Sequence, residues 1–397
     1  MEQKHILVIT QYFYPEPFRI NDMCMEWVKR GYRVTVLTGI PNYPQGEFYE
    51  GYSKKERRQE IWNGVEIIRI PLTARGHSSV KLFLNYLSFV KSGRKWVRKT
   101  KLKADFVFTF EVSPMTQALI GVWYSKKFKV PNYLYVQDLW PENVEIVTGI
   151  TNPLVIQPIS KMVNYIYKNC TAIFATSPSF VTEIQKRVED KSKVHYLPQY
   201  AEDFYQPMAR KPVPEISDDG RFKIIFTGNI GKAQGLDILP KTAELLKGED
   251  IVFVIVGDGR YREEFEKEIR ERGVEEMFIL IPRQPAERIP ELLAACDAAF
   301  LSFMDTPLFE KTIPAKLQSY MACGMPIIAS ASGETERIVT EANCGVCSPI
   351  GDEKALAGEI VDIRSHDLDS MGCNSREYCE SEFDKTAVMN MLENYFS

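Results

Sequence analysis

Short runs of β-branched and aromatic residues alternate with amphipathic segments of helix length along most of this chain. A strand that is followed by a helix returns to pair in parallel with a neighbouring strand, so the alternation predicts an α/β fold with parallel sheets. The first half contains six such runs, at 6–10, 33–37, 65–70, 106–110, 133–136 and 172–175. The second half contains five, at 223–226, 252–256, 278–281, 298–301 and 326–329.

One interruption divides this alternation. Between residues 200 and 219, proline and charged residues replace the pattern, which is typical of a linker. The length of 397 residues also exceeds that of one ordinary domain. We therefore predict two Rossmann-like domains, residues 1–200 and 221–380. Ligands of parallel sheets bind beyond the carboxyl ends of the strands, so we expect the binding cleft between the two domains.

Composition limits the classes of protein to consider. The formal net charge of −4 combines 28 Lys and Arg against 17 Asp and Glu in residues 1–200 with 21 against 36 in residues 201–397. The eight cysteines include one C-x2-C spacing, at Cys344 and Cys347, without a second ligand pair, which predicts a reducing compartment and no structural zinc. The polar N-terminus predicts no signal peptide, and no window approaches the ~20 apolar residues of a membrane span. We expect a cytoplasmic protein.

Most of the positive excess lies between Arg75 and Lys103, where nine basic residues occur without an acidic one and alternate with apolar and aromatic residues. Such a segment fits the surface of an anionic bilayer, and it fits equally well a core helix whose charges are solvated. No nucleic-acid-binding module accompanies the run, so we expect no nucleic-acid partner. The cations expected to face a membrane are Lys81, Lys91, Arg94, Lys95, Arg98 and Lys99.

The segment from Pro307 to Ser330 has the features of an anion-binding site. A polar loop follows a predicted strand, Pro314 stands where a helix is expected to begin, and Gly324 ends that helix. A helix start directs free amides and a positive dipole end toward an anion. Lys316 adds a full charge there, and Glu310 offers a carboxylate to sugar hydroxyls. The same punctuation also occurs in helices that bind nothing.

Two glycine-rich turns follow predicted strands of the second half and allow a phosphate to approach the backbone. Lys232 in the first turn is followed by Ala233 rather than Ser or Thr, so this turn is no Walker loop. The second turn lacks the third glycine of a dinucleotide site, so NAD is not expected. Either turn alone also fits a tight connection without a ligand. The residues proposed to bind a phosphate are Gly228, Asn229, Gly231, Gly235, Gly257 and Asp258.

These turns and the Pro314 segment resemble the donor site of retaining glycosyltransferases of family 4. The resemblance covers nearly the whole chain and includes residues 226–235, 256–259, 295–300, 332–336 and 345–352. Residues 41–46, 137–142 and 314–320 are most similar to WbuB-type enzymes, which are associated with L-fucosamine transfer in surface-polysaccharide assembly such as that of O-antigen or capsule.

The resemblance implies a GT-B fold, with two Rossmann-like domains facing each other across a cleft. The domain of residues 1–200 would bind the acceptor, that of residues 221–380 would bind a UDP-sugar donor, and the last helix, about residues 384–397, would pack back on the first domain. It further implies transfer with retention to a polyprenyl-diphosphate-linked glycan, at the inner face of the plasma membrane. Neither a cofactor nor a metal is expected, because cations and helix amides would stabilise the departing pyrophosphate without one.

The chain departs from the family at the donor site. The family's phosphate-binding Arg and Lys appear here as Asn229 and Gln234, which leaves Lys232 as the candidate substitute. The family's paired glutamates are replaced by Glu310, one place displaced, and by Ser319 beside Gln318, which could still hydrogen-bond a ribose. We expect Lys232 and Lys316 to stabilise the departing pyrophosphate. Arg283 is a second choice, and a solvated surface arginine explains it comparably well.

On the acceptor side, an aromatic and proline-rich turn follows the first strand, and its candidate contacts are Tyr14, Glu16 and Arg19. Asp138 occupies the position of the His-Asp pair of the family and is a candidate base for the acceptor hydroxyl, although an Asp that caps a turn explains it almost as well. Glu111, at the end of a strand, is the rival base. A sugar-nucleotide epimerase of the same fold and a non-catalytic nucleotide-sugar binder are the alternative functions.

Overall fold

The computed structural model describes residues 3–396, and their contacts divide the chain into two units. The first unit runs from the N-terminus to Leu197 and takes in the chain again from Asn394, whereas the second comprises Pro198–Glu393. The segment predicted as a linker is part of the second unit, where Val213 and Ile216 form a β-bridge and are buried in its core. Each unit is described by itself.

The first unit is built on a sheet with the strand order β3-β4-β2-β1-β5-β6-β7-β8. All neighbours pair in parallel except β3 and β4, which form an antiparallel pair at one edge. The strand order reverses between β1 and β5, which places the topological switch point there. The strands are β1 (His5–Ile9), β2 (Arg33–Thr38), β3 (Gln59–Trp62), β4 (Val65–Arg69), β5 (Phe106–Glu111), β6 (Asn132–Val136), β7 (Ala172–Ala175) and β8 (Val194–Tyr196).

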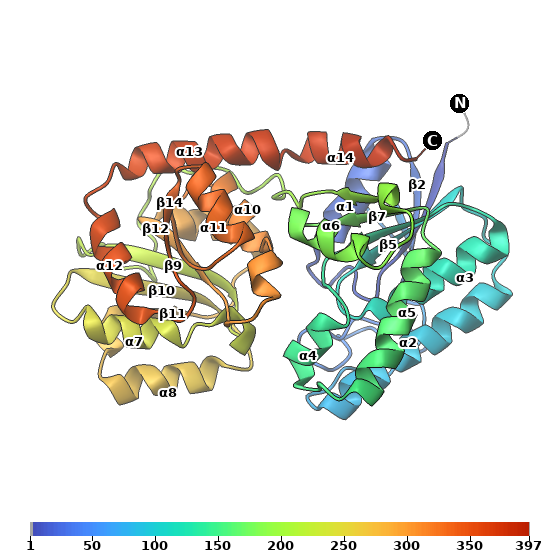
Figure 1. The fold of residues 1–397 in the computed structure, drawn as a ribbon, viewed down its shortest axis with the longest axis horizontal. Helices are drawn as coiled ribbons and strands as arrows, with labels where there is room; N and C mark the ends of the chain where they lie inside the picture. The colour runs from blue at the N-terminus through green and yellow to red at the C-terminus, as the bar shows by residue number, and fades with distance from the viewer. Residues whose placement is uncertain (1–2, 397) are drawn as a thin grey trace. The chain divides into compact units, whose positions relative to one another are not determined.

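Helix α3 packs against both α2 and α5 in this unit (Figure 1). In α2, a stripe at every fourth position, Asn85, Phe89, Gly93 and Val97, is buried against the core. A Cβ on Gly93 would lie 2.2 Å from Ile120 of α3, so glycine permits the close approach of these helices. The helices are α1 (Arg19–Lys29), α2 (Ser79–Lys99), α3 (Ala118–Phe128), α4 (Glu142–Thr148), α5 (Pro153–Lys168) and α6 (Pro178–Gln185).

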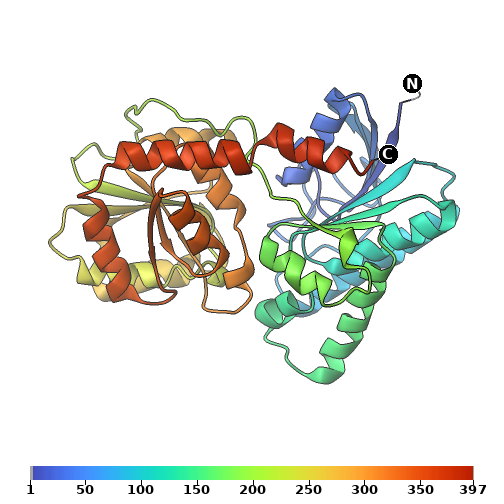
Figure 2. The same ribbon diagram turned by 45° about the horizontal axis from the view of Figure 1, so that its top comes forward.

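The end of the chain completes the aromatic core of the first unit. The Phe396 ring packs against Trp27, Phe106 and Tyr133, and the Phe396 carbonyl oxygen accepts a hydrogen bond from the Lys4 ammonium. The last helix, α14 (Lys385–Glu393), belongs to the second unit and follows α13 (Leu368–Glu382) nearly in line (Figure 2). The helix predicted over about residues 384–397 therefore ends before Tyr395 and Phe396, whose rings pack against side chains of the first unit.

The second unit has the strand order β11-β10-β9-β12-β13-β14, all parallel. This 3-2-1-4-5-6 order is that of a Rossmann sheet, with the switch point between β9 and β12. The strands are β9 (Phe222–Asn229), β10 (Ile251–Asp258), β11 (Phe278–Ile281), β12 (Ala298–Ser302), β13 (Ile327–Ser330) and β14 (Gly345–Ser348).

Helices cover both faces of this second sheet. One buried cluster includes side chains of α7, α8 and α12, and the other includes those of α9, α10, α11 and α13. The sheet residues between them are apolar on both faces, as expected for a buried parallel sheet. The helices not yet given are α7 (Ile238–Leu245), α8 (Arg262–Arg272), α9 (Ile289–Ala294), α10 (Ala315–Ala322), α11 (Glu334–Glu341) and α12 (Glu353–Ile363).

The predicted α/β class with two Rossmann-like sheets is confirmed. Each strand predicted from the sequence is present, with ends that differ by a few residues. Three strands were not predicted, namely β3, β8 and β14. All three are short, and each pairs with a single neighbouring strand.

Candidate functional site

The switch point of the second unit opens beside the middle of β9. Strands β9 and β12 pair only where Ala298 and Ala299 meet Ile224 and Ile225, and beyond that register they diverge. The Tyr320 hydroxyl of α10 fills the gap, because it accepts a hydrogen bond from the Thr227 amide at 2.8 Å and lies 3.3 Å from the Thr227 carbonyl oxygen. The buried Tyr320 side chain therefore fixes α10 to the carboxyl end of β9.

The glycine turn after β9 is held by contacts to its backbone. A Cβ on Gly235, whose φ is +58°, would lie 2.4 Å from the Phe303 carbonyl oxygen. The Met304 amide donates to the Ala233 carbonyl at 3.2 Å, and the Ser302 hydroxyl donates to the Gln234 carbonyl at 2.6 Å. The turn is thus fixed to the segment that follows β12, across the switch point.

Lys316 lies in the first turn of α10, one helical turn before Tyr320 and on the same face. Its ammonium nitrogen lies 4.1 Å from the centroid of the Phe226 ring and donates a hydrogen bond to the side-chain carbonyl of Gln234. No carboxylate among the described residues forms an ion pair with it. Burial lowers the pKa of Lys316 to about 7. An anion bound beside this ammonium would raise the pKa of Lys316 again. The protonated form of Lys316 would in turn bind the anion more tightly than the neutral form.

Of the other proposed donor residues, Gly228 lies beside Lys316, because a Cβ on Gly228 would be 3.5 Å from the Lys316 Cδ. The four residues described next lie along the same edge of the sheet. Lys232 is 71 % exposed and pairs with Glu264 of α8 at 3.0 Å. Asn229 and Asp258 are exposed at the ends of β9 and β10, and Asp258 accepts a hydrogen bond from the Gly259 amide. Arg283 is exposed after β11, two strands from β9, or roughly 10 Å.

Two proposed donor contacts need correction. Gln318 is fully buried, and its side-chain nitrogen and oxygen have no hydrogen-bond partner among the described residues. Ser319 is also buried, and its hydroxyl donates to the Ala315 carbonyl one turn earlier in the helix. Both side chains lie inside the unit and are not accessible to a ligand from solvent. The face of α10 that carries Lys316 is the one toward β9. Glu310 is exposed, and a Cβ on Gly333 at the start of α11 would lie 2.1 Å from its carbonyl oxygen.

Glu16 of the first unit also needs correction. It is 1 % exposed, and its carboxylate accepts the amides of Asn42 and Tyr43, each at 2.7 Å, and that of Phe13 at 3.3 Å. Burial raises the pKa of Glu16 to about 7, against the opposing effect of these amides. The carboxylate therefore joins the loops after β1 and β2 and does not face a ligand.

The other two residues of that turn are placed differently. Tyr14 stacks on Trp62 with ring centroids 4.3 Å apart, and its carbonyl accepts a hydrogen bond from Arg69. Arg19 opens α1 and opposes the rise that burial imposes on the pKa of Tyr135, which places its charge near the carboxyl end of β6. Tyr14 packs, whereas Arg19 remains a candidate contact.

Asp138 and Glu111 occupy the ends of β6 and β5. Asp138 is half-buried and accepts the Ser113 amide at 2.7 Å, and burial raises its pKa. Glu111 has no exposed surface, and burial together with the Asp138 charge raises its pKa well above the usual range. Glu111 is therefore an interior carboxyl group rather than a base that faces an acceptor.

From the sequence, Gln234 was interpreted only as a replacement of one of the family's phosphate-binding residues, and Tyr320 was not proposed as a site residue. The spacing of four residues between Lys316 and Tyr320 was the available signal for Tyr320. Arg75 was counted only within the basic run, although Arg75 lies among aromatic side chains of the first unit.

The six cations expected to face a membrane are all exposed on α2. Val80, Phe83, Leu84 and Leu87, on the first half of the helix, are exposed as well, with 64 % of Phe83 accessible. Apart from Lys81, the cations follow on the second half. No helix within residues 3–396 combines the length and the apolar character that crossing a bilayer requires.

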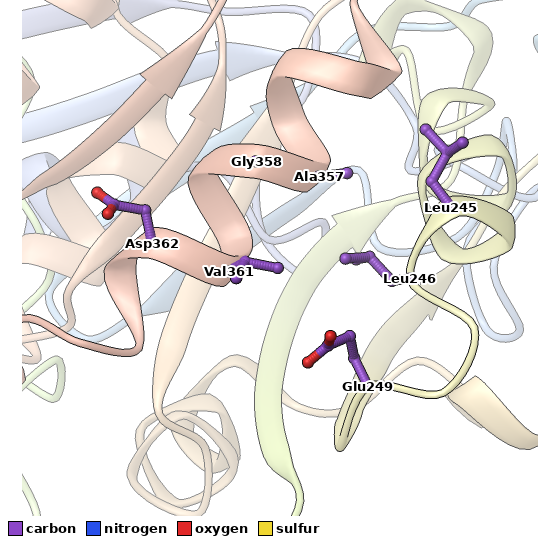
Figure 3. Close-up of a pocket in the computed structure, with 7 residues that line it drawn as sticks. All are labelled: Leu245, Leu246, Glu249, Ala357, Gly358, Val361 and Asp362. Carbon is purple, nitrogen blue, oxygen red and sulfur yellow. The ribbon is translucent and has the colours of Figure 1, made fainter.

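A surface pocket of about 520 Å³ lies between α7 and α12 in the second unit (Figure 3). Leu246 and Val361 point toward each other across it, whereas Asp362 points away. Its acidic groups are engaged, because Glu249 pairs with Arg364 and Asp362 with His366. The pocket is lined by none of the proposed site residues. Within the described part of the chain, no three His, Cys, Asp or Glu side chains gather as a metal site would need, and metal-independent chemistry stays a prediction.

Comparison with known proteins assigns both units. Residues 18–199 match the glycosyl transferase 4-like domain, and residues 209–380 match glycosyl transferases group 1. The chain is 25 % identical to the putative colanic acid biosynthesis glycosyl transferase WcaI of Escherichia coli K12, over 93 % of each chain. It is 26 % identical to the probable glycosyltransferase WbjE of Pseudomonas aeruginosa, over 63 % of this chain and 64 % of WbjE.

Solved structures agree on the fold. Sucrose-phosphate synthase from Thermosynechococcus elongatus superposes with a TM-score of 0.77 at 16 % identity, over 99 % of this chain and 98 % of that one. HepE from Anabaena, in complex with UDP-glucose, superposes with a TM-score of 0.72 at 14 % identity, over 99 % of each chain. With both of its units matched by glycosyltransferase families, the chain belongs to the glycosyltransferases and has the GT-B fold.

Proposed function

We propose that this chain is a retaining glycosyltransferase that moves a sugar from a UDP-sugar held by the second unit to a lipid-linked glycan held by the first. The observation that carries the proposal is the desolvated ammonium of Lys316. It lies in the first turn of a helix, next to a glycine turn, at the switch point of a Rossmann sheet. These are the groups that bind a diphosphate in such sheets.

The chemistry follows from the charge that develops on the leaving group. When the bond between the anomeric carbon and the diphosphate oxygen breaks, the departing UDP gains negative charge. The Lys316 ammonium and the first amides of α10 would lie beside that charge in a fixed arrangement, so little reorganisation would be needed. The acceptor hydroxyl must lose a proton as it attacks. Asp138, half-buried with a raised pKa, is the residue of the first unit suited to take it.

The finer identity of the substrates rests on resemblance. HepE was crystallised with UDP-glucose, which supports a UDP-linked donor. WcaI is described as a colanic acid biosynthesis enzyme, which supports a role in bacterial surface polysaccharide assembly. We propose an N-acetylated deoxysugar such as L-fucosamine as the transferred sugar, and a polyprenyl-diphosphate-linked oligosaccharide as the acceptor.

We also propose that α2 binds the anionic inner face of the plasma membrane. Its exposed apolar residues occupy the first half of the helix, and five of its cations occupy the second half. Apolar side chains in the interface and cations at the lipid phosphates are the two contributions that hold such helices on a bilayer. A protein held on the membrane by α2 could reach an acceptor whose lipid lies in the same membrane.

Calorimetric titration with UDP tests the donor site. We expect UDP to bind without metal, and Lys316→Ala to weaken UDP binding and transfer about 100-fold. Lys354→Ala is the matched control, because Lys354 is also the second residue of a helix of the same unit but is exposed. Equal UDP affinity in both variants would remove Lys316 from the site. Binding of GDP alone would change the donor, UDP binding without transfer would indicate an epimerase or a non-catalytic binder, and no nucleotide binding would overturn the proposal.

Flotation with anionic liposomes tests the membrane surface. Reversing the charges of Lys95, Arg98 and Lys99 should weaken binding roughly 100-fold, at about 1 kcal/mol per cation. UDP affinity should not change. The control reverses three exposed lysines of the same unit outside α2, namely Lys54, Lys55 and Lys161. Equal loss of binding in both triple variants would reject a specific role of α2.

A further inference from the structure

The first unit contains an arginine that is enclosed by tyrosines and lacks an acidic partner. Arg75 follows β4, and its guanidinium donates to the Tyr12 hydroxyl at 3.0 Å and lies over the Tyr43 ring at 5.1 Å. Its backbone amide is fixed by the Asn42 side chain at 2.9 Å. Within residues 3–396, no carboxylate forms an ion pair with this guanidinium.

Two half-buried arginines elsewhere in the protein show what is missing at Arg75. Arg187 pairs with Glu142 at 2.9 Å, and Arg262 pairs with Glu266 at 2.8 Å. A partly buried charge is usually retained with an opposite charge beside it, because removing an ion from water is costly. Aromatic faces supply only part of that stabilisation. Arg75 therefore has the surroundings of a cation whose anion is a ligand.

The groups around Arg75 form one side of a binding site. The rings of Tyr12, Phe18 and Tyr43 pack against one another with centroids 5.3 to 5.5 Å apart. The phenol of Tyr86, from the inner side of α2, completes the surroundings, since burial raises its pKa, Arg75 opposes the rise and Asp138 adds to it. A cation and aromatic surfaces thus meet at the carboxyl edge of the sheet.

The position of the site indicates what kind of molecule carries the anion. Arg75 precedes the start of α2 by four residues, and Phe83, Leu84 and Leu87, which flank Tyr86 on that helix, are exposed. A ligand with a phosphate at Arg75 and an apolar chain along the start of α2 would satisfy both features. We infer that Arg75 binds the diphosphate of a lipid-linked acceptor, an inference that rests on the proposed transfer to such a glycan.

Binding of three probes by the full-length chain in neutral detergent micelles separates the contribution of the phosphates to affinity from that of the lipid chain. The probes are geranylgeranyl diphosphate, geranylgeraniol, which lacks the phosphates, and inorganic pyrophosphate, which lacks the lipid. We expect the lipid diphosphate to bind most tightly. Arg75→Gln should weaken that binding about 10- to 100-fold, as expected for lost hydrogen bonds to a charged group, and leave geranylgeraniol binding unchanged. Arg75→Lys should fall between the two.

Controls distinguish this site from the donor site and from a structural defect. Lys161→Gln, which removes an exposed cation of the same unit, should leave all affinities unchanged. UDP binding should depend on Lys316 and not on Arg75. If the native protein does not bind UDP, the proposed donor is wrong. Binding of the lipid probes would still test whether Arg75 contacts a diphosphate.

Three outcomes would reject the inference. They are unchanged diphosphate binding in Arg75→Gln, a parallel loss of geranylgeraniol binding, and native affinity that is no higher for the diphosphate than for the alcohol. If Arg75→Gln does not fold, Arg75→Lys decides. An unchanged ratio of diphosphate to alcohol affinity in that variant would exclude a contact with the guanidinium.

Discussion

The two units share the 3-2-1-4-5-6 strand order, in the first unit over β4-β2-β1-β5-β6-β7, but one builds the carboxyl edge of its sheet from backbone and the other from side chains. In the second unit the edge is largely backbone, with glycines at close approaches such as that of Gly257 to Gly228. In the first unit the corresponding edge consists of side chains, among them Tyr12, Glu16 and Arg75. A backbone edge suits a diphosphate, which is the same in every nucleoside diphosphate sugar, whereas a side-chain edge can be varied for each acceptor.

The five tryptophans make this comparison measurable. Trp27, Trp62, Trp96, Trp123 and Trp140 all belong to the first unit. Tryptophan fluorescence therefore follows unfolding of the first unit, whereas far-ultraviolet circular dichroism follows both. A substitution in the first unit should shift both signals in urea. A substitution in the second unit should shift part of the dichroism change and leave the fluorescence transition in place.

The largest effect is expected for Gly257→Ala. A Cβ there would lie 1.9 Å from the Gly228 carbonyl oxygen, so β9 and β10 would have to separate at the glycine turn. We expect a loss of about 4 kcal/mol or more in the free energy of unfolding of the second unit. The dichroism transition should move to lower urea while the fluorescence transition stays.

Gly248→Ala is the matched control for that substitution. Gly248 also has a positive φ, +94°, but a Cβ there would meet no atom within 4 Å. Only the backbone strain remains, which costs about 1–2 kcal/mol. Equal losses in the two variants would show that the close approach of the backbones does not set the requirement for glycine at Gly257.

Glu16→Ala should act on the other unit. It would leave the amides of Asn42, Tyr43 and Phe13 without their acceptor, at a cost of about 3 kcal/mol. The fluorescence transition should move and UDP affinity should stay. Glu16→Gln keeps one acceptor oxygen and should lose roughly half as much. Loss of acceptor binding with unchanged stability would instead return Glu16 to the role of a ligand contact.

The pH dependence of UDP affinity tests the role of Lys316 at the backbone edge of the second unit. Lys316 has a pKa of about 7 in the free protein, and a bound diphosphate would raise it. The charged form binds better, so affinity should fall about tenfold per pH unit above pH 7 until the pKa of the complex is reached. Calorimetry in two buffers of different ionisation enthalpy should detect the proton taken up. Lys316→Arg, which stays charged, should bind UDP with a flat profile between pH 7 and 9.

The sequence predicts the elements of both sheets because their strands are buried and apolar on both faces. It misses β3 and β14, which are short and partly exposed, since their residues lack a clear period. It also predicts Lys316 and the glycine turn, because helix start and turn are local features. It does not predict that Gln234 rather than Lys232 meets Lys316, because contacts such as that of Ser302 with Gln234, 68 residues apart, orient the turn.

Burial of the acidic candidates escaped prediction for the same reason. The acceptor-side role of Glu16 rested on its place in a turn after a strand. Its actual partners, Asn42 and Tyr43, lie about 26 residues further on, in a loop that the sequence does not place. Side-chain edges depend on such distant contacts, and so sequence patterns specify the backbone edge of the second unit better than the side-chain edge of the first.

Tyr320→Phe tests a place where the backbone edge depends on a side chain. The Tyr320 hydroxyl satisfies the Thr227 amide at the point where β9 and β12 diverge, and removing it leaves that buried amide without an acceptor. We expect a loss of about 1 kcal/mol in the dichroism transition alone, since one neutral hydrogen bond is removed and no cavity larger than an oxygen is left. Because the same face of α10 carries Lys316, UDP affinity should fall by a few-fold, with the profile against pH keeping its midpoint near 7. A flat profile would mean that the hydroxyl sets the burial of Lys316 as well as the position of the helix, and a shift of the fluorescence transition would show that the two edges are coupled.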